Sequence, residues 1–343
     1  MRATKLPSSY PLQLGHNETE KRPNTNLSIR KSSATMRAVM RRNAIRSLML
    51  IPFLIMPLLW AQESVYKLNV NVDLTEVHVN VTDEKDRPLG TLKRENFRIF
   101  EDRTEQKISL FKHEDLPISL GLVIDNSRSM EPRKQRMDTA ALSFVRKSNA
   151  QDETFIVHFD DAARLDRDFT DSIPLLEETL ASAKPYGQTA IYDALILALD
   201  HMAAAKHPKK AILLFTDGVD NSSQRTLSEA IEATKRVHVA VYTVGLLSAS
   251  GEQKAEDSLV RIAEASGGRA YFPLTVDEAR TYMERAARDL REQYTIGYFP
   301  SNSSHDGAWR SVRVEVLLAP GMPATTKLNA NYRHGYYGPG AIN

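Results

Sequence analysis

Hydrophobic and polar residues alternate in the first globular stretch of the chain. Between Val65 and Phe111, apolar side chains occupy every second position in segments such as VYKLNVNVDLTEV, and EKDRPLG interrupts them with turn-forming residues. A period of two is that of a β-strand with one buried face. We therefore predict a small antiparallel β segment over residues 62–115.

The pattern changes between Pro117 and Gln293, where continuous apolar runs alternate with helical stripes. The runs ISLGLVI, FIVHF, AILLF and VAVYTV are typical of strands that are covered on both faces. Between them apolar residues recur at helical spacing, and Gly267 and Gly268 end one of these stripes. Alternating strands and helices predict an α/β fold over residues 116–293, a doubly wound, mostly parallel sheet flanked by helices.

Strand-like alternation returns after this region, over residues 294–343. It is visible in YTIGYF, WRSVRVEVLL and LNANYRHGYY, which the polar loop PSNSSHDGA and other turn residues separate. A few strands with one apolar face are marginally stable alone. We therefore expect this C-terminal segment to pack with residues 62–115 as one small β domain.

The N-terminal residues have the character of an export signal. Residues 1–35 are polar and without periodicity, which predicts disorder and suggests that translation starts at Met36. Arginines then precede a short apolar block that prolines interrupt, so residues 36–61 are predicted to be a signal peptide cleaved after Ala61. Leu59 is bulky for its place before this cleavage site, and an uncleaved membrane anchor is the alternative. We expect a secreted or periplasmic protein.

Composition excludes several kinds of site. The chain of 343 residues has no cysteine, so disulfides, thiolate nucleophiles and cysteine-based zinc sites are excluded. An exported chain without cysteine is more typical of bacteria than of eukaryotic secretion. A net charge of +2, from 45 basic and 43 acidic residues, gives no field that would attract nucleic acid or a membrane surface.

Oxygen-bearing side chains follow the predicted strands of the α/β region. Asp125, Ser127 and Ser129 lie in LVIDNSRSM, Thr189 lies in YGQTAIYDAL, and Asp217 ends LLFTD. Ligands of doubly wound sheets bind beyond the carboxyl ends of the strands, where the strand order reverses. A set of oxygen donors without histidine or cysteine suits Mg²⁺ and does not suit zinc.

These three motifs resemble the metal-ion-dependent adhesion site of the von Willebrand factor type A domain. The family pattern is Asp-x-Ser-x-Ser, then a distant threonine, then a distant aspartate, in this chain order. The resemblance covers about residues 116–293, and the whole chain resembles bacterial proteins with such a domain and an export signal. It implies that Ser127 and Ser129 ligate the metal, Thr189 directly or through water, and Asp125 and Asp217 mostly through waters or hydrogen bonds.

The resemblance also implies a function. It predicts a non-enzymatic, adhesion-like module in which Mg²⁺, with Ca²⁺ or Mn²⁺ as alternatives, binds an exposed aspartate or glutamate of a protein partner. No nucleic acid is expected, and a membrane is expected only if the N-terminal segment stays uncleaved. The family usually has glycine between the two serines, where this chain has Arg128. That arginine either weakens the metal or pairs with the incoming acidic group.

Other interpretations of the same residues stay open. Aspartate and serine are common helix N-caps, so the first motif alone could be a helix start. Asp193 and Asp220 are interpreted as hydrogen-bonding helix and turn residues. A structural scaffold with a vestigial metal site is the main alternative function. A phosphoryl-transfer enzyme is the weaker one, because Ser127 stands where such phosphatases have a second aspartate and no phosphate-cradling motif is present. The partner and the oligomeric state are not predicted.

Overall fold

The computed structural model describes residues 74–146, 149–247 and 253–340, which fall within one compact unit, Leu68–Asn343. The predicted disordered segment 1–35 and the predicted signal peptide 36–61 lie outside the described residues. In the part of the chain that is described, no helix combines the length and apolar character needed to cross a membrane.

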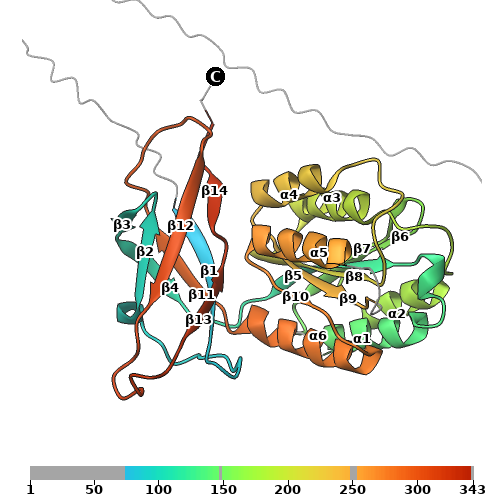
Figure 1. Ribbon diagram of the computed structural model, residues 1–343, viewed down its shortest axis with the longest axis horizontal. Helices are drawn as coiled ribbons and strands as arrows, with labels where there is room; N and C mark the ends of the chain where they lie inside the picture. The colour runs from blue at the N-terminus through green and yellow to red at the C-terminus, as the bar shows by residue number, and fades with distance from the viewer. Residues whose placement is uncertain (1–73, 147–148, 248–252, 341–343) are drawn as a thin grey trace, which may run out of the picture. The chain divides into compact units, whose positions relative to one another are not determined.

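A mostly parallel sheet forms the centre of the α/β region (Figure 1). Its strands run in the order β10 (Ala270–Tyr271), β9 (Ala240–Gly245), β8 (Lys209–Thr216), β5 (Ile118–Asp125), β6 (Glu153–Phe159) and β7 (Ala163–Thr170). Neighbours are parallel except β6 and β7, which are antiparallel. The predicted fold class is confirmed.

Helices cover both faces of this sheet. One face carries α1 (Lys134–Arg146), α2 (Ile173–Ser182) and α6 (Val276–Arg291), and the other carries α3 (Ile191–His201), α4 (Leu227–Arg236) and α5 (Gln253–Ser266) (Figure 1). Every residue of β5 is buried, so successive side chains enter opposite cores. Leu122 packs in the cluster that contains Met137 and Met283, whereas Val123 packs in the cluster that contains Leu195. Burial on both faces explains the continuous apolar run of the sequence.

The strand order reverses next to β5. The chain passes from β5 to β6 on one side, and later returns to place β8 on the other side of β5. The loops that leave β5 and β8 therefore meet at the carboxyl edge of the sheet, where ligands bind in doubly wound folds. This is the edge at which Asp125 and Asp217 lie.

The strands before and after the α/β region form a two-sheet β sandwich. One sheet runs β13 (Asn329–Tyr332), β1 (Thr75–Thr82), β11 (Tyr294–Tyr298), β4 (Ile108–Lys112), and the other runs β14 (Gly335–Tyr337), β12 (Trp309–Val316), β2 (Phe97–Glu101), β3 (Thr104–Gln106). β1 is antiparallel to β11 and β13, and β2 is antiparallel to β12. Side chains from both sheets, including Val79 and Val312, share one apolar core. Each sheet thus combines strands from both ends of the described chain. Short 3₁₀ turns, η1 (Arg94–Asn96), η2 (Arg128–Met130) and η3 (Met202–Ala204), complete the element order.

The β sandwich contacts the α/β region through a glycine pair. The Asn331 side-chain amide donates to the carbonyl of Gly267 at 2.7 Å. Gly267 has a φ of +77°, the left-handed conformation that ends α5. A Cβ on Gly268 would lie 2.0 Å from the carbonyl oxygen of Val241, so only glycine fits there. The predicted helix stop is also a packing requirement.

We expect Thr226→Ala to lower the free energy of unfolding by about 1 kcal/mol. The Thr226 hydroxyl accepts from the Glu229 backbone N–H at 3.2 Å, and the Glu229 carboxylate accepts from the Thr226 backbone N–H at 2.8 Å. This capping box satisfies two backbone donors at the start of α4. Urea denaturation measures the loss, and Thr226→Ser is the control that keeps the hydroxyl. Equal stability of the alanine and serine variants would contradict the capping role.

Candidate metal centre

Asp125 organises the loop that leaves β5. It is the last residue of the strand and is 1% exposed. Its Oδ1 accepts from the Ser127 backbone N–H at 2.8 Å, and its Oδ2 accepts from the Thr216 hydroxyl at 2.6 Å. Burial raises the pKa of Asp125 to about 6, against the opposing effect of the hydrogen bonds from Ser127 and Thr216. Both carboxylate oxygens are therefore engaged in holding the loop to β8.

A chain of oxygen atoms connects the β5 loop to the β8 loop. Ser127 Oγ and Ser129 Oγ are 3.0 Å apart, and Ser129 Oγ donates to Asp217 Oδ1 at 2.8 Å. Because each hydroxyl has one proton, Ser127 is the donor to Ser129. Ser129 belongs to the 3₁₀ turn η2 (Arg128–Met130) that starts after β5, and Ser127 is the N-cap of this turn, which places both side chains at the carboxyl edge. The structure thus brings Ser127, Ser129 and Asp217 together.

Thr189 reaches the same region from the loop before α3. Its backbone N–H donates to the Asn221 side chain at 2.9 Å, and its carbonyl accepts from the Asn221 N–H at 3.0 Å. A Cβ built on Gly218 would lie 3.7 Å from Thr189 Oγ1, so this hydroxyl lies beside the residue that follows Asp217. No described residue forms a hydrogen bond with Thr189 Oγ1. Its lone pairs remain available for a ligand.

Backbone hydrogen bonds hold the loops in place. The Asn126 N–H donates to Phe159 at 2.7 Å, and the Tyr186 N–H donates to Asn126 at 2.9 Å. Gly187, at a φ of +69°, brings its backbone against Asp161, where a Cβ would lie 2.5 Å from the carboxylate. Such bonds restrict the positions of the site residues before any ligand arrives.

Two further aspartates near the site have structural roles. Asp193 accepts from the backbone N–H groups of Gln224 and Arg225, both at 2.9 Å. Asp220 accepts from the Ser223 hydroxyl at 2.5 Å. The interpretation of Asp193 as a hydrogen-bonding helix residue is confirmed, and Asp220 is a hydrogen-bonding residue of the loop after β8.

Arg133 is the site residue that the sequence analysis missed. Its Nη1 forms an ion pair with Asp217 Oδ2. The Asp217 side chain is 1% exposed and the Arg133 side chain is 38% exposed, so the cation shields the carboxylate from solvent. Arg133 lies four residues after Ser129, across the turn into α1. This spacing was the feature of the sequence that could have placed Arg133 near the site.

Arg128 behaves differently from Arg133. Its side chain is exposed and forms no hydrogen bond or ion pair with the described residues, while its backbone N–H donates to Gly187 at 3.3 Å. The arginine between the serines therefore makes no hydrogen bond with the oxygen atoms that the loops assemble.

The donors present fit a hard divalent cation. The side chains that the three loops bring together offer two carboxylates and three hydroxyls, without nitrogen or sulfur. Oxygen-only sets of this kind suit Mg²⁺. Among the described residues, no group of three or more histidine, cysteine, aspartate or glutamate side chains is arranged to hold a metal, so a zinc-type cluster is absent there.

One comparison with known protein families concerns the α/β region. The sequence model described as von Willebrand factor type A domain matches residues 120–219. A search of curated proteins gives no match. The von Willebrand factor domain of the type V pili tip protein Mfa5 from Porphyromonas gingivalis is 15% identical, with a TM-score of 0.45, covering 51% of this chain and 95% of that chain.

Other solved structures show similarity at the same level. An aerotolerance-related membrane protein from Bacteroides fragilis is 16% identical, with a TM-score of 0.42, covering 50% of this chain and 98% of that chain. Proximal thread matrix protein 1 from the mussel byssus, with a zinc-occupied MIDAS motif, is 18% identical with a TM-score of 0.43. The alignment covers 54% of this chain and 48% of the mussel protein, about half its length.

The matched residues begin inside β5 and end just after Asp217, so they include every predicted metal ligand. Together with the mostly parallel sheet and its helices, the match assigns the α/β region to this domain family. The chain contains a von Willebrand factor type A domain, matched over residues 120–219.

Proposed function

We propose that this chain is an exported, non-enzymatic binding module that engages an acidic group of a protein partner through a divalent cation. The observation that carries the proposal is the convergence of Ser127, Ser129 and Asp217 at the reversal of strand order, with 3.0 Å and 2.8 Å between successive oxygens. Thr189, with its free hydroxyl oxygen, adds a donor from the third loop.

The residues proposed to hold the cation are Asp125, Ser127, Ser129, Thr189 and Asp217. Mg²⁺ is the proposed ion, because all donors are oxygens and the site offers fewer protein ligands than Ca²⁺ usually takes. When bound, the ion would supply an electrophilic coordination position for a carboxylate. Ser127 and Ser129 would have to exchange their mutual hydrogen bond for coordination, and Asp125 would keep the loop in place through Thr216.

The proposed partner group is an aspartate or glutamate side chain. Exposed Arg128 and half-buried Arg133 add positive charge beside the site, which favours a carboxylate. Tyr186 is 61% exposed on a loop that is bonded to Asn126. Tyrosine and arginine are common in the energetically dominant parts of interfaces.

The carboxylates favour binding over phosphoryl transfer. Asp125 has both oxygens in hydrogen bonds, and Asp217 has one oxygen bonded to Ser129 and the other paired with Arg133. A nucleophilic carboxylate needs a free oxygen directed at the substrate. Neither aspartate offers one in this arrangement.

The scaffold alternative has one observation in its favour. The ion pair between Arg133 and Asp217 supplies a positive charge to the site from within the chain. If this arginine satisfies Asp217 permanently, the loops would be stabilised without a metal.

Calorimetric titration with Mg²⁺ and partner capture from an envelope extract test the proposal. We expect saturable Mg²⁺ binding and capture that EDTA abolishes and added Mg²⁺ restores. Ser129→Ala should lose both, because it removes the oxygen between Ser127 and Asp217. Ser222→Ala is the matched control, since its hydroxyl only donates to the Asp161 carbonyl, at 2.9 Å. Capture that is indifferent to EDTA would favour the scaffold.

Sequencing the N-terminus of exported protein tests cleavage after Ala61.

A further inference from the structure

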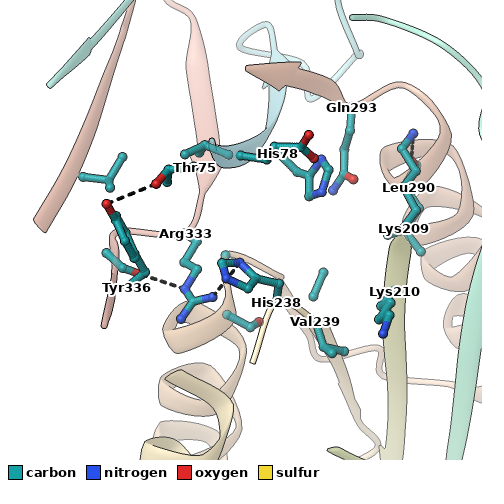
Figure 2. A pocket seen from close by; sticks show the side chains of 17 residues that line it. Thr75, His78, Lys209, Lys210, His238, Val239, Leu290, Gln293, Arg333 and Tyr336 are labelled. Carbon is teal, nitrogen blue, oxygen red and sulfur yellow. Dashed lines mark hydrogen bonds between the residues drawn. The ribbon is translucent and has the colours of Figure 1, made fainter. Parts of the chain in front are cut away.

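A small cavity lies at the other edge of the parallel sheet (Figure 2). It is lined by β1, by the first residues of β8 and by the segment between α4 and β9, and its volume is about 50 Å³. β8 runs from this cavity to the metal centre, a length of about 26 Å for eight residues. The cavity is therefore separate from the proposed metal centre.

The lining is rich in basic side chains. Figure 2 shows His78, Lys209, Lys210, His238 and Arg333 around the cavity. The carboxylate among the lining residues is Glu76, on β1. The chain as a whole is almost neutral, so this concentration of basic side chains is local.

Lys209 is a buried cation without an acidic partner. The residue is 2% exposed, and its Nζ donates to the carbonyls of Glu114 at 3.3 Å and Leu290 at 3.2 Å. No described carboxylate lies within ion-pair distance of it. An ammonium has three N–H donors, so one remains unused. A buried charge is normally paired, and the unused donor of this ammonium is available to an anion.

Arg333 adds a second cation with a similar arrangement. Its guanidinium donates to the carbonyls of Gly335 at 2.6 Å and Val237 at 2.8 Å, and to that of Lys235. The same Nη1 contacts His238 Nδ1 at 3.2 Å. Four of the five N–H groups of Arg333 are thereby used. Because His238 accepts at Nδ1, its remaining ring nitrogen, Nε2, carries the proton and can donate. Both groups retain a donor for a ligand.

Crowding of basic groups also changes their protonation. Burial, with Lys209 and His238 nearby, lowers the pKa of His78 to about 4. Burial lowers the pKa of Lys209, and it lowers the pKa of Arg333 to about 10. The carboxylates of Asp115, Asp152 and Glu114 oppose this effect at Lys209 from outside the cavity lining. An anion inside the cavity would add a direct contact with the basic groups.

We propose that this cavity binds a small tetrahedral oxyanion, phosphate or sulfate, through Lys209, Arg333 and His238. Holding one water takes about 10–15 Å³ of such volume, so the cavity has room for about four oxygen atoms and not for a nucleotide. The three residues come from β8, from the turn between β13 and β14, and from the segment before β9. The anion would consequently hold the β sandwich to the α/β region.

Calorimetric titration of the full exported chain with sodium phosphate and sodium sulfate tests this site. Chloride at matched ionic strength corrects for general salt effects, sodium acetate tests the geometry, and EDTA keeps divalent metal away from the other centre. We expect one saturable site for phosphate and for sulfate. Thermal unfolding followed in the same buffers should show a midpoint raised by both oxyanions and unchanged by chloride.

Variants assign the binding to the cavity. Lys209→Met should weaken phosphate binding at least tenfold, whereas Lys85→Met removes the same charge from an exposed turn and should leave it unchanged. Glu76→Gln removes the lining carboxylate from an exposed strand position and should strengthen binding about threefold. This variant keeps the test valid even if Lys209→Met folds poorly.

The outcomes separate clearly. Tenfold loss in Lys209→Met with tighter binding in Glu76→Gln supports the site. Absence of saturable binding, equal loss in Lys85→Met, or weaker binding in Glu76→Gln overturns it. Acetate binding as tight as phosphate binding would overturn the assignment to a tetrahedral anion.

Discussion

Replacing Asp217 with asparagine is expected to weaken Mg²⁺ binding about 100-fold. The substitution removes a negative charge that accepts from Ser129 at 2.8 Å and pairs with Arg133. The loss of affinity should lie at the upper end of the roughly tenfold to 100-fold range that is typical when a residue supporting a metal site is replaced. The reason is that Arg133 would keep its positive charge beside the site without a partner. Calorimetric titration of the full chain with Mg²⁺ measures the change.

Asp220→Asn is the control for this substitution. Asp220 lies three residues later and its carboxylate accepts from Ser223 and from the Tyr192 backbone N–H, outside the oxygen chain. The Asp220→Asn variant should retain Mg²⁺ affinity within about threefold, because the substitution removes a charge that acts on the site only at long range. Similar losses in both variants would show that the effect comes from net charge and not from the Asp217 position.

Replacing Arg133 with glutamine is expected to tighten Mg²⁺ binding by about fivefold to thirtyfold. A unit charge about 5 Å from a divalent ion opposes it by several kcal/mol at an effective dielectric constant of about 20. Arg133 is 38% exposed, so solvent screening reduces the expected gain to about 1–2 kcal/mol. Glutamine keeps the length and a donor for Asp217 while removing the charge.

Arg128→Gln is the matched comparison. Arg128 is exposed and has no side-chain partner among the described residues, so its removal should change Mg²⁺ affinity by less than about threefold. A larger effect at Arg128 than at Arg133 would contradict the geometry. The scaffold alternative predicts a different series, in which the native chain does not bind Mg²⁺ and Arg133→Gln acquires binding. The double variant Asp217→Asn, Arg133→Gln measures the coupling between the two residues.

Asp125 and Asp217 could be identified from the sequence because each ends an apolar run, whereas Ser127, Ser129 and Thr189 were implied as ligands by the resemblance to the von Willebrand factor type A domain. Asp125 and Asp217 follow apolar runs that are long enough for buried strands, and such strands align their carboxyl ends. That five side chains hold one ion stays a prediction. Arg133 was not predicted as a site residue, because its pairing with Asp217, 84 positions away, depends on how the turn after Ser129 leads into α1.

The glycine pair shows how local sequence preference and tertiary packing act on the same residues. The sequence identified Gly267 and Gly268 as a helix stop, which is a local property of glycine. Only the structure shows that a Cβ on Gly267 would meet the backbone of Arg333 at 2.3 Å, where the β sandwich approaches α5. The same residue thus ends a helix and permits a contact that no local pattern encodes.

By itself the sequence determined the class of the fold, the positions of most helices and strands, and the oxygen-bearing residues at two strand ends. Periodicity decides these features, because the spacing of apolar residues along the chain shows whether one face or both faces of a helix or strand are buried. Tertiary structure alone decided the pairing of β1 with β11 and β13, the ion pair of Arg133 and the cluster around Lys209. These depend on contacts between distant segments, such as the Thr75 hydroxyl donating to Tyr336 across 261 positions, and the free energy of packing the whole chain selects them.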